Sequence, residues 1–253
     1  MKPAKVLLCA IIPCMLACSI NPPCWQNEGT IAVMADPDDW NRIESSLRDV
    51  FEHTIRTPQI ESYFTLNHVI NEDFRRYTKF QHLILAGTLE SEGKIGTLIN
   101  EVIADPAVKE KVRSGEIFRI IKKDQWARDQ LLMILVAKDV YHLRKQITQY
   151  RDMLYEPFNS HAVSQIKEHM FRRDEQKHIE KRLMSRYNWS IRIQHDYFIA
   201  QEKPRQGFIF FRRLLPERWL FVRWIDSIDT TGLNSEWVLA ERERIGKKYY
   251  GGD

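Results

Sequence analysis

Cysteine is absent from almost the whole chain. All four cysteines lie within the first 24 residues, and the body from Trp25 to Asp253 has none. This excludes disulfide-stabilised scaffolds and cysteine-ligated metal sites in the body. A body without thiols is typical of proteins in an oxidising compartment, where stray cysteines cross-link. Cytosolic proteins can also lack cysteine, so this feature alone does not decide the compartment.

The apolar segment at the N-terminus is too short to span a membrane. It runs from Val6 to Leu16, whereas a transmembrane helix needs about 20 residues. Because Lys2 and Lys5 precede it, the segment has the charge and length of a signal peptide.

This segment ends in Met15-Leu16-Ala17-Cys18-Ser19, which resembles the lipobox of bacterial lipoproteins. In that motif a small residue precedes a cysteine whose thiol accepts a diacylglyceryl group. The sequence therefore predicts a signal peptide at 1–17, a lipid on Cys18 and a tether at 18–28. Two alternatives stay open. Ordinary secretory cleavage after Ala17 would leave a soluble protein, and an uncleaved segment would itself be the anchor.

The chain has only a small excess of positive charge. The chain has 38 Lys and Arg against 34 Asp and Glu, a net charge of +4. Nucleic-acid-binding proteins usually concentrate a stronger basic excess on one face, so no nucleic-acid partner is predicted. No glycine-rich phosphate loop follows a predicted strand, which argues against a nucleotide-binding fold. A Gly-x-Ser-x-Gly elbow is also missing, and we predict no catalytic residue and no cofactor.

Apolar periodicity predicts both strands and helices in the body. The predicted strands are residues 29–35, 62–69, 80–89, 116–122, 131–137, 190–198, 207–214 and 219–226. The predicted helices are residues 37–54, 95–103, 139–186 with a break around 155–159, and 234–247. This order predicts an α+β fold with a largely antiparallel sheet and helices packed mainly on one face. We expect one domain over 29–253; an alternative divides it into two similar halves, about 29–137 and 138–253.

Three histidines, His161, His169 and His178, lie on the longest predicted helical stretch. Their spacings of eight and nine residues do not place them on one helix face. Glu175 and His178 form one Glu-x-x-His motif, whereas a di-iron bundle needs two such motifs and further carboxylates. We therefore predict a solvated helix face and no metal site; a metal site is the alternative.

Aromatic residues and arginines are interspersed in the hairpin predicted at 207–226. Trp219, Phe221 and Arg223 share one face of its second strand, and Trp224 lies on the other face. Aromatic rings beside guanidinium groups can stack on sugar rings or hold a peptide. These four residues are the predicted binding surface. The alternative is that the protein itself covers both faces of the hairpin.

Several short motifs resemble an uncharacterised family of bacterial envelope lipoproteins, known only as a domain of unknown function. The most specific is Trp126-Ala127-x-x-Gln130 before the apolar strand 131–137; Pro58-Gln59-Ile60-Glu61 and His82-Leu83-Ile84-Leu85 are further matches. The resemblance implies no activity, cofactor or catalytic residue. It also implies a further C-terminal segment that this chain lacks. We therefore expect either a shortened product or an exposed face that a partner covers.

Together these features predict a lipid-anchored protein of the cell envelope, on the outer membrane and facing the periplasm. Its predicted role is non-catalytic, either binding or structural. The predicted partner is another envelope protein or a glycan, in addition to the membrane contact through the lipid. The alternative is an envelope hydrolase whose site is assembled from scattered residues. Converging carboxylates, or a histidine with an orienting partner, would favour the hydrolase. An exposed aromatic and basic surface would favour the binding protein.

Overall fold

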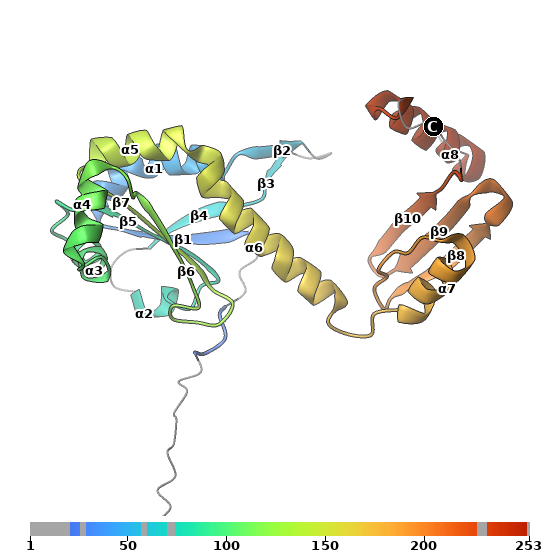
Figure 1. Cartoon of the computed structure of the whole chain (residues 1–253), viewed down its shortest axis with the longest axis horizontal. Helices are drawn as coiled ribbons and strands as arrows, with labels where there is room; N and C mark the ends of the chain where they lie inside the picture. Colours follow the sequence, from blue (N-terminus) through green and yellow to red (C-terminus); the bar gives the residue numbers. More distant parts are fainter. Residues whose placement is uncertain (1–20, 26–28, 57–59, 70–73, 227–231, 252–253) are drawn as a thin grey trace, which may run out of the picture. The chain divides into compact units, whose positions relative to one another are not determined.

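The computed structural model describes residues 21–25, 29–56, 60–69, 74–226 and 232–251 (Figure 1). The predicted signal peptide and Cys18 lie outside these residues. The chain forms two compact units, 1–166 and 167–253, which we describe one at a time. The division falls between Ile166 and Lys167 and not near residue 137, where the alternative of two halves placed it. Within the described residues, none of the helices combines the length and the apolar character that crossing a bilayer requires.

The first unit is built on a five-stranded sheet with the strand order β4-β1-β5-β7-β6. The strands are β1 (Thr30–Ala35), β4 (Thr65–Val69), β5 (His82–Thr88), β6 (Arg119–Lys123) and β7 (Leu131–Ala137). β1 runs parallel to β4 and β5, β5 runs parallel to β7, and β6 pairs antiparallel with β7. Every residue of β5 and β7 is buried, which is typical of parallel strands covered on both faces.

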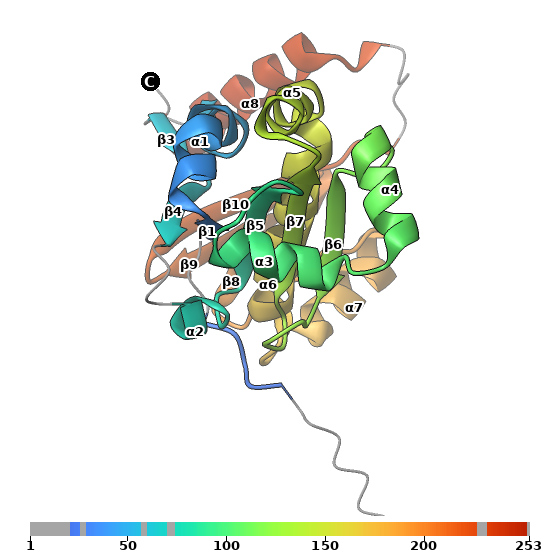
Figure 2. The same ribbon diagram turned by 90° about the vertical axis from the view of Figure 1, so that its left-hand side faces the viewer.

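Helices cover both faces of this sheet (Figures 1 and 2). The first unit contains α1 (Pro37–Phe51), α2 (Phe74–Tyr77), α3 (Lys94–Val102), α4 (Pro106–Ser114), α5 (Val140–Gln149), most of α6 (Arg151–Phe171), and a small hairpin of β2 (Thr54–Arg56) and β3 (Ile60–Ser62). α1, α5 and α6 bury Leu47, Leu143 and Phe158 against one face of the sheet. α3 and α4 bury Ile99 and Val112 against the other face.

The α+β class is confirmed, but two features predicted for the sheet are wrong. The main sheet is mostly parallel rather than largely antiparallel, and helices pack on both of its faces rather than mainly on one. The physical reason is visible in β1, β5 and β7, which are continuous apolar runs. A strand with one solvated face alternates apolar and polar residues instead. Within this sheet, only the β6–β7 pair is antiparallel.

The helix break predicted around 155–159 is also wrong, because α6 runs through Pro157. Proline has no N–H, so the carbonyl of Met153, four residues earlier, loses its helical donor. The guanidinium of Arg119 donates to that carbonyl instead. A side chain from β6 therefore stabilises the helix at the residue that would otherwise interrupt it.

Helix α4 was not predicted, because the nearest predicted helix covers 95–103 and stops before Asp105-Pro106. The structure shows that this pair begins a helix. The carboxylate of Asp105 accepts a hydrogen bond from the Ala107 N–H at 2.8 Å, and Pro106 occupies the first helical position. Gly115, at a φ of +80°, ends the helix in the left-handed conformation that glycine adopts easily.

The second unit is a three-stranded antiparallel sheet between two helices (Figure 1). Its strands, in the order β10-β9-β8, are β8 (Tyr197–Lys203), β9 (Phe208–Leu214) and β10 (Glu217–Arg223). Helix α7 (Lys177–Tyr187) buries Leu183 with Ile209 and Phe211 on one face of the sheet. Helix α8 (Ser235–Tyr250) buries Ile245 with Phe208 and Phe210 on the other face.

The hairpin β9–β10 and the last helix are confirmed, and Asn234 caps α8 by accepting a bond from the Trp237 N–H at 2.9 Å. The strand predicted at 190–198 is wrong over most of its length, because β8 begins only at Tyr197. The amide of Gln176 donates to the carbonyl of Gln194 at 2.9 Å. The segment before β8 is therefore held by a side chain and not by a strand ladder.

Candidate functional site

The carboxyl ends of β1, β5 and β7 meet at one edge of the first unit's sheet. In open α/β sheets ligands usually bind at this edge, next to the strand where the order reverses. β1 is that strand here, because the chain passes from β1 to β4 on one side of it and then crosses to β5 on the other side. A cleft of about 620 Å³ opens at this edge. Its charged lining is mostly acidic: Asp36, Asp38, Asp39, Glu90, Glu92 and Asp139, with Arg42.

The carboxylate of Asp36 occupies the N-terminus of α3. It accepts hydrogen bonds from the backbone N–H groups of Ile95 at 3.1 Å and Gly96 at 2.8 Å, and Asp36 is only 8% exposed. Gly93 allows this approach, because a Cβ added there would lie 2.2 Å from the carboxyl carbon of Asp36. A helix N-terminus is a natural anion site, and here the chain supplies the anion itself.

Asp39 ties the loop after β5 to helix α1. Its Oδ2 accepts a hydrogen bond from the Ser91 hydroxyl at 2.5 Å, and the Ser91 oxygen accepts one from the Thr88 N–H at 2.8 Å. Burial raises the pKa of the Asp39 carboxyl, while the Ser91 bond acts in the opposite direction. A carboxyl with a raised pKa in a cleft is a candidate acid–base group.

Asp139 begins α5 in a similar way. It accepts a hydrogen bond from the His142 N–H at 2.9 Å, and its carboxylate contacts Nδ1 of the same histidine at 2.7 Å. The backbone bond, and then the side-chain bond, lower the pKa of Asp139. Asp36 and Asp139 thus fill the N-termini of two helices at this edge. Together with the acidic lining, this disfavours a phosphate or other anionic ligand here.

A buried histidine pair lies elsewhere in the first unit. His82, 2% exposed, has its Nε2 at 3.0 Å from Nδ1 of His161, and its own Nδ1 has no hydrogen-bond partner among the described residues. Burial, and then the neighbouring His161, lower the pKa of His82 to about 3. The pair is therefore neutral near pH 7.

The three histidines of the long helical stretch lie in different surroundings. The prediction of a solvated face is confirmed for His169 and His178, which are exposed, and wrong for half-buried His161. In the part of the chain that the structure describes, no three His, Cys, Asp or Glu side chains gather as a metal-ligand group. That the protein binds no metal stays a prediction.

The four residues of the predicted binding surface lie on two faces of the second unit's sheet. Trp219, Phe221 and Arg223 pair across the hairpin with residues of β9 that lie on the α8 side. Trp224 lies on the opposite side, and its ring packs against Trp189 at 5.4 Å within the core under α7. Three of the four side chains therefore share one surface.

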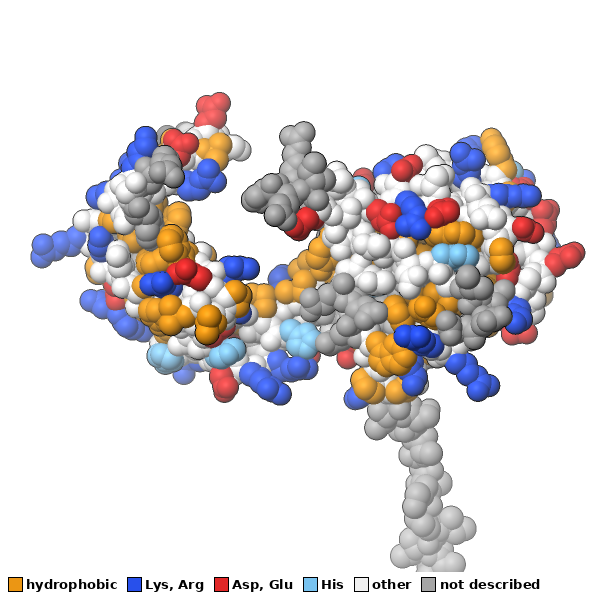
Figure 3. All heavy atoms as spheres, turned by 180° about the vertical axis from the view of Figure 1, so that it is seen from behind, with side chains coloured by type: hydrophobic (Ala, Val, Ile, Leu, Met, Phe, Trp, Pro, Cys, Tyr) orange, Lys and Arg blue, Asp and Glu red, His pale blue; other side chains and the backbone are white. Residues whose placement is uncertain are grey.

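Helix α8 covers only part of that surface. Tyr249 stacks on Phe208 at a ring distance of 4.4 Å near one end of the hairpin. Near the turn, Trp219 is 59% exposed, Leu215 is 87% exposed and Phe198 of β8 is 43% exposed. Figure 3 shows apolar and basic side chains next to each other on this unit.

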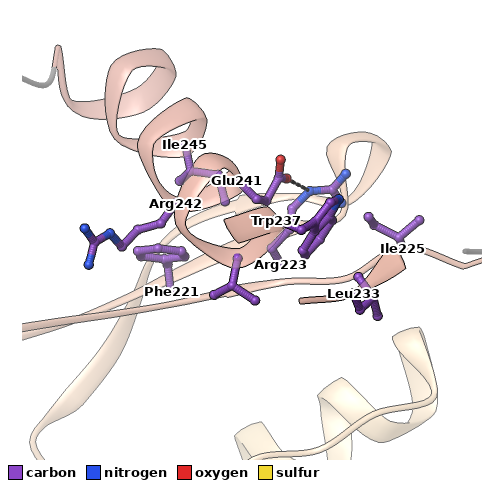
Figure 4. Close-up of a pocket in the computed structure, with 9 residues that line it drawn as sticks. Phe221, Arg223, Ile225, Leu233, Trp237, Glu241, Arg242 and Ile245 are labelled. Atoms are coloured by element: carbon purple, nitrogen blue, oxygen red, sulfur yellow. Dashed lines mark hydrogen bonds and ion pairs between the residues drawn. The ribbon is translucent and has the colours of Figure 1, made fainter. Parts of the chain in front are cut away.

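A groove of about 420 Å³ lies between β10 and α8 (Figure 4). Phe221 and Arg223 line it from β10, and Trp237, Glu241 and Ile245 line it from α8. The guanidinium of Arg223 pairs with the carboxylate of Glu241 at 3.2 Å, so this charge is neutralised within the groove. The remaining walls are mainly apolar, and the groove therefore fits an apolar side chain.

The two units differ in charge. The second unit has 18 Lys and Arg against 13 Asp and Glu, whereas the first has 20 against 21. The whole net charge of +4 therefore comes from the smaller unit. Four of the seven tryptophans also lie in it, so aromatic and basic residues are concentrated in the same part of the chain.

The sequence did not predict the α8 wall of the groove, the acidic cleft or the His82–His161 pair. The α8 residues follow helical spacing, which indicates a buried helix face but not which part of it stays open. Asp36 and Asp139 directly precede α1 and α5, but only Asp139 caps the helix that follows it, because the Asp36 side chain bonds α3 instead. No sequence signal links His82 to His161, which lie 79 positions apart.

Comparison with known proteins gives one match. Residues 26–171 match a family model described as a domain of unknown function, DUF8532. The match covers most of the first unit and all of α6, and it covers more than half of the chain. Neither the curated proteins nor the solved structures contain a match to this chain.

Proposed function

The chain belongs to the family of the domain of unknown function DUF8532, and we propose that it is a lipid-anchored protein of the bacterial cell envelope that binds another protein. In this proposal a lipid on Cys18 holds the chain at the outer membrane, facing the periplasm. The surface formed by Trp219, Phe221 and Arg223, which we call the hairpin surface, binds the partner. The role is non-catalytic.

One observation carries the proposal: a large indole is mostly exposed beside an apolar groove. Trp219 is 59% exposed on the same sheet face as Phe221, which lines the groove. Contiguous exposed apolar surface marks interaction sites, and tryptophan and arginine are the residues that most often dominate binding energy. A groove between an edge strand and a helix is a common way to hold a polypeptide segment. A glycan, the other partner predicted from the sequence, would need more polar groups than these walls offer.

The lipid anchor is tested by Cys18→Ala. The native protein should partition with detergent, and the variant should lose the acyl chains and move to the aqueous phase. If the variant stays with the membrane fraction, the lipobox interpretation is wrong.

The binding role is tested by site-specific photo-cross-linking of the full-length protein in its own membrane. A photoreactive residue at Trp219 should yield a defined protein adduct. The control position is Tyr141 in the first unit, which is also aromatic and is 70% exposed. Adducts of equal yield from both positions, or none from Trp219, would contradict the proposal.

The alternative is an envelope hydrolase, and the acidic cleft of the first unit favours it. Asp39 has a raised pKa there, and Asp139 orients His142. Against it, Asp36 and Asp139 already bond helix N-termini, and Asp39 bonds Ser91. The hydrolase predicts activity of the purified protein on an acyl-ester or glycan substrate, lowered about a hundredfold or more by Asp39→Asn.

A further inference from the structure

The two edges of the second unit's sheet are not alike. At one edge, β8 pairs with β9 through an irregularity between Ile199 and Gln201. At the other edge, β10 pairs with β9 over all seven residues without a break. Irregular edge strands resist pairing with another chain, whereas a regular edge strand leaves its unpaired backbone groups open to it. β10 is thus the edge at which the sheet can be extended.

The backbone of β10 presents alternate residues to that edge. The N–H of Trp224 donates to the carbonyl of Gly207 at 2.9 Å, so Trp224 faces β9. In an antiparallel strand the hydrogen-bonding direction alternates from residue to residue. The N–H and C=O groups of Phe221 and Arg223 therefore point away from β9, toward the edge.

We infer that β10 pairs antiparallel with β10 of a second copy of this chain, with Leu220 opposite itself. The inference rests on the proposed function, because it names the partner of the hairpin surface. In this register Trp219 lies opposite Phe221 at two symmetric positions, and aromatic pairs of this kind stabilise cross-strand neighbours. Glu217 lies opposite Arg223, and both keep their partners within the chain, Arg212 and Glu241.

Other registers keep less of this complementarity, because each shift leaves one aromatic pair, Trp219 or Phe221 with its own copy, in place of two. Side chains opposite each other must lie on the same face, so the pairing shifts only in steps of two residues. A shift in one direction places Glu217 opposite Phe221, and a shift in the other places it opposite Ile225. Both shifts also shorten the paired segment. The register centred on Leu220 is therefore the only one of the three that matches all seven residues of β10.

The apolar groove gives the same pairing a second contact. Phe221 lines the groove, and in this register Trp219 of the second copy lies directly across from it, about 5 Å away, on the α8 side. The indole that is 59% exposed in one copy would then cover the apolar groove of the other. Because the pairing is symmetric, both grooves are covered at once.

Disulfide trapping tests the register. Residues whose backbone faces away from the partner strand form non-hydrogen-bonded pairs with Cα atoms about 4.5 Å apart, a separation that a disulfide can bridge. Leu220 would form such a pair with its own copy. We expect Leu220→Cys, in a Cys24→Ser background, to give a covalent dimer when the full-length protein is mildly oxidised in its membrane.

Val222→Cys is the matched control. It lies on the same strand and the same face as Leu220, but the two copies of residue 222 would be four positions apart, roughly 14 Å. We expect Leu220→Cys to cross-link at least ten times faster than Val222→Cys, and the Cys24→Ser background to give no dimer. Equal rates, a faster Val222→Cys, or no dimer from Leu220→Cys would overturn the inference, provided that reduced Leu220→Cys melts like the background.

Failure of this inference is distinguishable from failure of the proposed function. If Leu220→Cys gives no dimer while the photoreactive residue at Trp219 captures a different protein, the hairpin surface binds a partner that is not a second copy. If Trp219 captures nothing, the proposed binding role itself fails.

Discussion

The two units of this protein differ in which of their side chains are engaged within the fold and which are exposed to solvent. In the first unit three of the six acidic residues that line the carboxyl edge of the sheet bond helix N-termini or a loop, as Asp36 does for α3. In the second unit an apolar groove stays open, and Trp219 remains largely in solvent. At the carboxyl edge, where α/β sheets usually bind ligands, these three carboxylates contribute to the stability of the fold. The smaller unit has the surface that a partner can use.

The distribution of exposed apolar residues supports this contrast. Of the 18 large apolar side chains that are exposed among the described residues, 11 lie in the second unit, which holds about a third of the chain. Isolated exposed apolar residues need no explanation, but their concentration in one unit does. This contrast predicts that truncating a buried aromatic residue of the first unit will impair folding. Truncating an exposed aromatic residue of the second unit will instead impair binding.

The largest expected effect is that of Phe158→Ala in the first unit. Phe158 is fully buried, and its ring lies 5.4 Å from that of Phe51 and 5.5 Å from that of His82. Removing it should lower the free energy of unfolding by about 3–5 kcal/mol, because a cavity is left in a close-packed core. Urea denaturation measures the change. The matched variant is Phe198→Ala in the second unit, 43% exposed, which should cost less than about 1 kcal/mol. Equal losses of unfolding free energy in the two variants would contradict the contrast between the two units.

The second effect is a dependence of stability on pH. The pKa of His82 is about 3 in the folded protein and 6.5 when unperturbed, so between these values the unfolded chain binds a proton that the folded chain does not. Stability therefore falls as the pH is lowered through this window, by up to about 1.4 kcal/mol per pH unit, or about 2 kcal/mol between pH 6.5 and 5. His82→Gln should flatten that slope.

The control for the pH effect is His169→Gln. His169 is exposed, so its removal should leave the slope between pH 6.5 and 5 unchanged. An unchanged slope in His82→Gln would mean that the buried pair is not the source of the acid sensitivity.

The third effect concerns the cap of α3. Asp36→Ala removes the acceptor of two backbone N–H groups and should lower the free energy of unfolding by about 1–2 kcal/mol. Asp38→Ala, two residues later and exposed, should change it by less than about 0.5 kcal/mol. Similar small effects from both would mean that the acidic edge is free for a ligand after all.

Much of the fold could be predicted because apolar runs and apolar spacing are local signals. β7 matches its predicted bounds, and α8 begins at Ser235, one residue after the predicted start. The errors occurred where a distant group decides the local structure. Pro157 leaves the carbonyl of Met153 without its helical donor, and Arg119, 38 positions before the proline, donates to that carbonyl instead. No local pattern contains that information.

The candidate site could be predicted only in part, for the same reason. Strand alternation placed Trp219, Phe221 and Arg223 on one face and Trp224 on the other, which the structure confirms. Whether a face is covered depends on where α8 packs, and that depends on tertiary contacts such as Tyr249 on Phe208. The groove therefore follows from the packing of α8, which depends on a contact between residues 41 positions apart in the sequence.

Of the main variants, setting the controls aside, Trp219→Ala is expected to change stability least, and it is the variant that best separates folding from binding. The indole is 59% exposed; it donates to Glu217 at 3.0 Å and meets Phe210 edge-on at 6.0 Å. Losing these contacts should cost less than about 1 kcal/mol. The same change removes the residue that a partner would bury most, so binding should weaken at least tenfold. Thermal unfolding and a binding titration of one preparation give both numbers. A large loss of stability would show that Trp219 belongs to the core of the second unit, and an unchanged affinity would show that the partner binds elsewhere.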